Sequence, residues 1–154
     1  MARTFARTRP ANEEVLALQT QVGTVLDSVL ADKALQDDGP WIYVRRSTEQ
    51  GDGPIFLNGT TNYDGGASWE VVRFRKDRFN RVWVEGTAVT GAYHAVFQLP
   101  KGYRPRKYQS FVGAADGASN SARIDVHSDG NVILAAGGGG VFFSLGGINF
   151  EAEA

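Results

Sequence analysis

The side chains whose type and spacing best suit ligand binding are aromatic and polar residues in predicted loops between residues 63 and 94. They are Tyr63, Asp64, Trp69, Tyr93 and His94. Aromatic rings stack on the apolar face of a sugar, while carboxylate and imidazole groups hydrogen-bond to its hydroxyls. The set therefore predicts a saccharide-binding site. For each ring taken singly, packing in the core or in a subunit interface is the alternative interpretation.

Residue patterns for catalysis and metal binding are missing from the sequence. A glycoside hydrolase needs two carboxylates flanking a cleft, and the acids of this chain stand in no diagnostic motif. His94 and His127 are the two histidines, and neither has a second ligand at metal-binding spacing. We therefore expect no catalytic residue, no metal, no cofactor and no enzyme activity.

Composition narrows the classes of partner. The 154 residues carry a net charge of -1, which gives no overall attraction to nucleic acid or to an anionic membrane. No stretch approaches the roughly 20 apolar residues of a membrane span, and residues 1–10 lack the apolar segment of a signal peptide. We expect a protein that is made in the cytoplasm, binds no nucleic acid and does not insert into membranes.

A helix is predicted over residues 12–36, and its apolar residues follow a heptad. Val15, Leu18, Val22, Val25 and Val29 fall on one narrow seam of the helix. Valine at both a and d positions favours three strands over two. Since fewer than four heptads stabilise little alone, the prediction is a short trimeric coiled coil assisted by the rest of the chain. The alternative is a single helix folded back on its own β domain.

Beyond Gly39-Pro40 the sequence changes to short β-type runs separated by turn residues. Alternating runs such as Arg81-Val-Trp-Val-Glu85 are typical of half-buried antiparallel strands, and together the runs predict a β-sandwich or jelly roll. Turns are expected at 77–80 and 128–131, where Asn80 and Asp129-Gly130 tolerate positive φ. The predicted strands are 41–46, 55–57, 69–76, 81–89, 95–99, 108–114, 122–127, 131–135, 141–145 and 148–151.

The first ten residues combine several cations with one aromatic ring. Arg3, Arg7 and Arg9 can pair with carboxylates, and Phe5 offers an apolar anchor. We expect these four residues to dock the chain into a larger assembly. A frayed terminus is the alternative, since chain ends are commonly disordered.

An ordered set of short motifs runs through residues 55–150. It consists of Leu57-Asn-Gly-Thr-Thr-Asn-Tyr63, Arg73-Phe-Arg-Lys-Asp77, Arg81-Val-Trp-Val-Glu-Gly86, Phe97-Gln-Leu-Pro-Lys-Gly-Tyr-Arg-Pro105, Arg123-Ile-Asp-Val-His-Ser-Asp-Gly-Asn-Val132 and Ser144-Leu-Gly-Gly-Ile-Asn-Phe150. In this order the motifs resemble the C-terminal head domain of bacteriophage tail, baseplate and fibre proteins. The resemblance implies a β-rich, trimeric head at the tip of a virion appendage that contacts the host surface.

Residue patterns and resemblance together give one predicted organisation. Residues 1–11 form an anchoring arm that binds another virion protein, 12–36 a coiled-coil helix, 37–54 a linker with the first strand, and 55–154 a β-sandwich head. The expected function is that of a homotrimeric virion protein, made in the host cytoplasm, whose head binds a host-surface saccharide during adsorption. The alternatives are a decorative capsid or tail fibre without an essential ligand, and, less favoured, a polysaccharide depolymerase.

Overall fold

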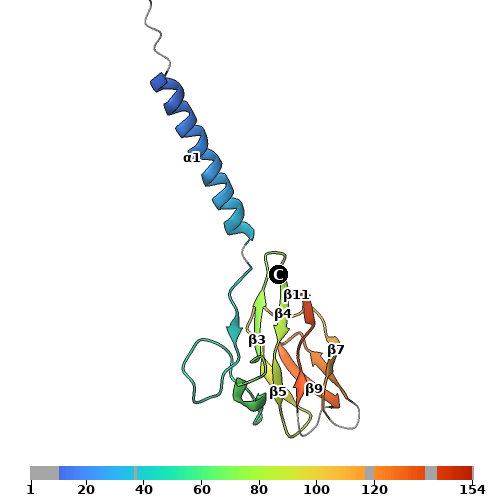
Figure 1. The fold of residues 1–154 in the computed structure, drawn as a ribbon. Helices are drawn as coiled ribbons and strands as arrows, with labels where there is room; N and C mark the ends of the chain where they lie inside the picture. Colours follow the sequence, from blue (N-terminus) through green and yellow to red (C-terminus); the bar gives the residue numbers. More distant parts are fainter. Residues whose placement is uncertain (1–10, 37, 117–119, 138–141, 154) are drawn as a thin grey trace, which may run out of the picture. The chain divides into compact units, whose positions relative to one another are not determined.

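The computed structural model of the chain describes residues 11–36, 38–116, 120–137 and 142–153. The chain divides into two compact units between Asp37 and Asp38, a helical unit and a β-rich head (Figure 1). The residues predicted to anchor the chain, Arg3, Phe5, Arg7 and Arg9, lie outside the described part.

The helical unit is one long α-helix, α1, spanning Ala11–Gln36. Val15, Leu18, Val22 and Val25 on the predicted seam are each between 51% and 59% exposed, and the side chain of Val29 lies outside the described residues. The predicted N-terminal helix and its end before Gly39-Pro40 are confirmed. Assembly of this seam with partner helices stays a prediction. None of the described helical residues forms a segment long and apolar enough to cross a membrane.

The head is built from three antiparallel sheets with the strand orders β1-β3-β4-β11, β10-β5-β2 and β6-β9-β8-β7. The strands are β1 (Ile42–Tyr43), β2 (Thr61–Asn62), β3 (Arg73–Lys76), β4 (Arg81–Glu85), β5 (Thr87–Val89), β6 (Ala95–Gln98), β7 (Gln109–Ala114), β8 (Ser121–Val126), β9 (Asn131–Gly137), β10 (Phe143–Ser144) and β11 (Ile148–Glu151). A short 3-10 helix, η1, covers Tyr63–Gly66. The prediction of a mainly β, antiparallel fold behind an N-terminal helix is confirmed.

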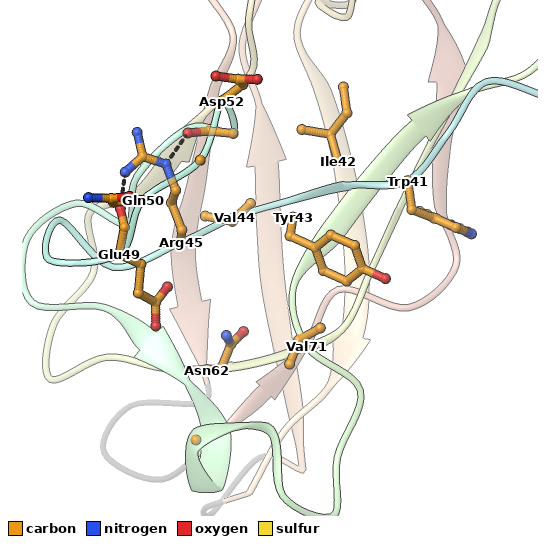
Figure 2. A pocket seen from close by; sticks show the side chains of 13 residues that line it. Trp41, Ile42, Tyr43, Val44, Arg45, Glu49, Gln50, Asp52, Asn62 and Val71 are labelled. Carbon is orange, nitrogen blue, oxygen red and sulfur yellow. Dashed lines mark hydrogen bonds between the residues drawn. The ribbon is translucent and has the colours of Figure 1, made fainter.

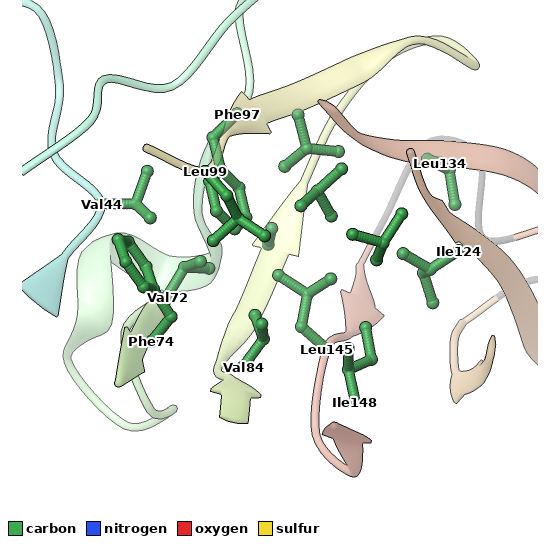
Figure 3. Close-up of a cluster of buried hydrophobic side chains, with 14 of the residues drawn as sticks. Val44, Val72, Phe74, Val84, Phe97, Leu99, Ile124, Leu134, Leu145 and Ile148 are labelled. Carbon is green, nitrogen blue, oxygen red and sulfur yellow. The ribbon is translucent and has the colours of Figure 1, made fainter. Parts of the chain in front are cut away.

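One hydrophobic core holds the three sheets of the head together. Phe74 and Val84 reach it from the first sheet, and Phe97 and Leu134 from the third (Figure 3). Phe143 reaches it from the second sheet. Along β4 and β8 the buried residues alternate with more exposed ones, because successive side chains of a strand point to opposite faces. The outward residues of these strands are therefore free to form surface sites.

Several strand boundaries differ from the prediction, among them those of the predicted strand 41–46, which is shortened to Ile42–Tyr43. Strand β3 begins at Arg73 instead of Trp69, because the Val72 amide donates to the side chain of Asn62 in place of a ladder partner. The run 81–89 is split at Gly86, whose φ is +115° and where a Cβ would lie 2.5 Å from the carbonyl oxygen of Val71. Strand β2 was not predicted, and the predicted strand 55–57 is reduced to a bridge between Arg45 and Ile55.

Two hairpin turns are closed by aspartates at the positions predicted. Asp77 accepts hydrogen bonds from the amides of Phe79 and Arg81 and from the indole of Trp83, each at 2.9 Å. Burial acts to raise the pKa of Asp77, but these hydrogen bonds outweigh it and lower the pKa below its ordinary value of 3.8. The pKa of Asp129 is lowered as well, chiefly by the hydrogen bond from the Asn131 amide.

These carboxylates predict that the head loses stability in acid. A carboxyl group whose pKa is lower in the folded state stabilises that state above its unfolded pKa, and the contribution is lost as the pH falls through the folded pKa. Urea unfolding, monitored by circular dichroism at several pH values, should therefore show a urea concentration at the midpoint that decreases once the pH falls below about 4. The urea midpoint of the Asp77→Ala/Asp129→Ala variant should be lower than that of the unaltered protein at neutral pH, and it should decrease less on acidification. An equally steep fall in the variant would contradict the assignment.

Candidate functional site

Tyr63, Asp64 and Trp69 of the predicted saccharide set lie together around the turn formed by η1. Asp64 adopts a positive φ of 47°, and its carboxylate accepts hydrogen bonds from the amides of Gly66, Ala67 and Ser68 at 3.0 to 3.2 Å. Both carboxylate oxygens are thus engaged within the turn. Asp64 therefore shapes the loop that presents Tyr63 and Trp69.

An aromatic cluster, defined here as Tyr63, Trp69 and Phe142, covers this turn. The ring centroid of Tyr63 lies 5.8 Å from that of Trp69 and 5.1 Å from that of Phe142, and the Trp69 and Phe142 rings are 5.2 Å apart. Trp69 remains 46% exposed. Ring pairs at these distances stabilise one another while leaving faces open to a ligand. Residue-by-residue reasoning missed Phe142, although the pair Phe142-Phe143 should place one ring in the core and one outside.

Tyr93 and His94 belong to a different loop. Strands β2 and β5 are antiparallel, and Asn62 pairs with Ala88, so Tyr63 lies near the first residue of β5, Thr87. The loop that carries Tyr93 follows the last residue of β5, at the opposite end of the strand. Tyr93 is 60% exposed, and the Nε2 atom of His94 lies 3.1 Å from the Thr90 hydroxyl. Within the described residues, no ring contact or hydrogen bond joins either residue to the aromatic cluster. The five predicted residues thus divide into a group of three and a group of two.

The aromatic cluster lies at the end of β3 opposite to the first residues of the head. Asp38 forms an ion pair with Arg75 at 3.0 Å, and the Gly39 amide donates to the carbonyl of Lys76, the last residue of β3. Trp69 precedes the first residue of that strand. Four strand residues span roughly 10 Å. The head therefore has one end that carries Asp38 and Gly39 and another end that carries the aromatic cluster.

A pocket of about 670 Å³ opens beside β1 and was not anticipated from the sequence (Figure 2). It is lined by residues 41–45, by the loop 49–53 and by Asn62, Gly65 and Val71. Its volume is within the range of small-molecule sites, roughly 300–1,000 Å³. A second hollow of about 360 Å³ shares Tyr43 and Val71 with it and extends past Trp69. The two hollows together make this side of the head concave.

Charged groups fix the aromatic rim of the pocket. The guanidinium carbons of Arg73 and Arg75 lie 4.5 and 4.7 Å from the ring centroid of Trp41. Arg73 also forms ion pairs with Glu85 at 2.6 Å and Glu70 at 3.1 Å. Burial acts to lower the pKa of Arg73, but the hydrogen bonds and the acidic neighbours raise it above its ordinary value. Arg73 and Arg75 therefore act as supports for the ring of Trp41.

Metal binding has no support in the geometry. Among the described residues, no group of three or more histidine, cysteine, aspartate or glutamate side chains is arranged to hold an ion. The perturbed acids Asp77 and Asp129 serve turns, as shown above.

The fold itself is that of a phage receptor-binding protein. A solved structure that matches is the crystal structure of the receptor binding protein (gp15) of Listeria phage PSA, with a TM-score of 0.65 over 94% of this chain and 88% of that chain. The two sequences are 18% identical, so the comparison shows a shared fold. No protein-family model matches the sequence, and no curated protein does.

Proposed function

We propose that this chain is a virion protein of a bacteriophage that takes part in adsorption, with the β head contacting a saccharide on the host surface. The observation that carries the proposal is the shared fold with a phage receptor binding protein. The exposed aromatic cluster supports it, since Tyr63 and Trp69 offer ring faces at the end of the head away from Asp38 and Gly39. Rings at such an end are accessible to a large surface such as a cell wall.

The proposed organisation assigns a separate task to each part of the chain. The arm of residues 1–11 binds another virion protein through Arg3, Phe5, Arg7 and Arg9, and the helix joins three copies along its exposed seam. Residues 37–54 connect the helix to the head of residues 55–154. Three weak sites held on one trimer bind a repetitive surface tightly through avidity. Modest affinity at each site is therefore sufficient for adsorption.

The proposed mode of action is binding without catalysis. Exposed aromatic rings and amide groups suit recognition of a sugar, whereas depolymerisation needs a pair of carboxylates across a scissile bond. Purified full-length protein should release no reducing sugar from the polysaccharide of cells that it binds. Release above the level of a heat-inactivated sample would restore the depolymerase alternative.

Cell binding tests the adsorption proposal directly. Fluorescently labelled full-length protein should bind at least one strain of a bacterial panel, measured by flow cytometry. Trp69→Ala should weaken this binding by about tenfold or more, because an exposed ring at a recognition surface contributes far more than an average contact. The matched control is Phe79→Ala, which removes a ring that is 71% exposed in the turn after β3, at the opposite end of that strand.

The outcomes separate the two binding-related functions. Loss of cell binding in Trp69→Ala but not in Phe79→Ala supports adsorption through the aromatic cluster. Failure of the unaltered protein to bind any strain favours the decorative fibre. Equal effects of the two substitutions would contradict the placement of the binding surface.

A further inference from the structure

The pocket beside β1 has the form of a binding site that is separate from the aromatic cluster. Figure 2 shows Tyr43 and Glu49 on either side of an open space, with Asn62 and Val71 along its lower edge. Tyr43 is 51% exposed, and the guanidinium carbon of Arg73 lies 5.9 Å from its ring centroid, so a ligand can stack only on the ring face away from Arg73. An aromatic ring and several polar groups thus border one cavity.

Two polar side chains in this pocket retain unused hydrogen-bonding groups. The Oδ1 atom of Asn62 accepts from the Val72 amide at 2.8 Å, and its Nδ2 group has no partner among the described residues. The Oε2 atom of Glu49 accepts from the Arg46 amide at 2.8 Å, and no described group donates to Oε1. The pocket therefore offers one fixed donor and one fixed acceptor.

The loop that walls the pocket is held in place by its own hydrogen bonds. The Arg45 side chain donates to the carbonyls of Gly53, at 2.8 Å, and Glu49, and the Glu49 amide donates to the Arg46 carbonyl at 3.0 Å. Gly53 packs so tightly that a Cβ there would lie 2.0 Å from the carbonyl oxygen of Tyr43. A preformed pocket binds its ligand without the cost of ordering a loop.

The charges around the pocket cancel. Arg45, Glu49 and Asp52 line it, and the guanidinium of Arg46 lies 3.9 Å from the position that a Cβ on Gly65 would take. Two cations thus stand beside two anions, and Arg73 and Arg75 at the Trp41 rim are paired with Glu70, Glu85 and Asp38. Such a balance gives no net attraction for a phosphate or a uronate, whereas hydroxyl groups can both donate and accept there.

We propose that this pocket binds a neutral pyranose unit, with the apolar face of the sugar on the ring of Tyr43. Sugar hydroxyls donate to Glu49 Oε1 and accept from Asn62 Nδ2. The inference rests on the proposed function for the source of the sugar, a glycan of the host surface. It adds a second saccharide site and defines the charge of the ligand.

Saturation-transfer NMR followed by titration tests the pocket in the full-length protein. The neutral probes are glucose, galactose, N-acetylglucosamine and N-acetylgalactosamine, and glucuronic acid is the anionic comparison. At least one neutral sugar should bind. Asn62→Asp keeps the acceptor for the Val72 amide and replaces the free donor by an acceptor, so affinity should fall about tenfold or more while the fold is retained.

Tyr43 provides the second arm of the test. Tyr43→Ala should also lower the affinity about tenfold or more, whereas Tyr43→Phe keeps the ring and should bind within about twofold of the unaltered protein. The matched control is Tyr108→Ala, which removes a ring that is 69% exposed and stacks on His127, outside the pocket. Melting curves monitored by circular dichroism establish that each variant is folded.

The outcomes distinguish this pocket from the adsorption role. The inference is overturned if no neutral sugar binds, if binding is unchanged in both Asn62→Asp and Tyr43→Ala, or if glucuronic acid binds more tightly than every neutral sugar. Sugar binding that depends on both residues supports the pocket even when no strain is bound, in which case the adsorption proposal fails alone. Cell binding without sugar binding in the pocket overturns this inference and leaves the adsorption proposal standing.

Discussion

Replacing Phe97 by alanine is expected to lower the free energy of unfolding of the head by about 3–5 kcal/mol. Phe97 is fully buried, and its ring stacks on that of Phe74 with centroids 6.2 Å apart. Phe74 in turn contacts Tyr103 edge to face at 5.2 Å. Removing the ring therefore leaves a cavity between two sheets and deprives Phe74 of a packing partner.

A β-bulge explains why this position cannot repack easily. The register between β6 and β9 shifts between Ala95 and Phe97, and both Val96 and Phe97 are buried. Two successive residues of one strand thus face the core, against the usual alternation. Because the bulge fixes the backbone at this position, neighbouring side chains have little freedom to fill the cavity that the missing ring would leave.

Equilibrium unfolding in urea at a fixed protein concentration measures the loss, since assembly would make stability depend on concentration. The matched control is Val112→Ala in β7, where the side chain is 78% exposed and truncation should change stability by less than about 0.5 kcal/mol. A loss below about 1 kcal/mol for Phe97→Ala would show that the core relaxes around the missing ring.

The elements of the fold could be predicted from local signals because those signals are strong. The heptad up to Gln36, the alternation of Arg81–Glu85 and the turn at Asn80, with φ +60°, each follow from a few neighbouring residues. The boundaries that failed depend on distant partners. The Val72 amide donates to Asn62, ten residues away, while the Val72 carbonyl still accepts from the Val44 amide, and no periodicity in the sequence indicates such contacts.

In the candidate sites too, some residues could be predicted from their sequence neighbours, whereas others depend on distant partners. Tyr63 and Trp69 stand out in sequence because turn residues surround them, and the structure brings them together. For Tyr43 the sequence predicts only a position in the strand 41–46. Its role as the wall of a pocket arises from the loop that Arg45 holds and from Asn62, which reaches this place through β2. Pockets formed by segments that meet only after folding leave no spacing signature in the sequence.

The second large effect is expected from the helical seam, where Val22→Asp/Val25→Asp should convert the proposed trimer into monomers. Both valines are more than half exposed in the single chain, at 55% and 56%. Burying two carboxylates per helix among partner helices would cost more than the short seam provides, whereas the isolated helix tolerates them. Sedimentation analysis of the full-length protein at micromolar concentration measures the mass. Binding to cells should fall by roughly a hundredfold or more as avidity is lost.

Thr20→Asp is the control for this variant, because the substituted residue lies off the seam and adds a like charge to the same helix. It should leave both mass and cell binding unchanged. A monomeric unaltered protein would contradict the trimer altogether. A variant that stays trimeric would show that the heads hold the assembly, because a seam of fewer than four heptads contributes too little to be the sole interface. The mass of the variant therefore decides which of the two units carries the association, and cell binding reports whether three linked heads are needed for adsorption.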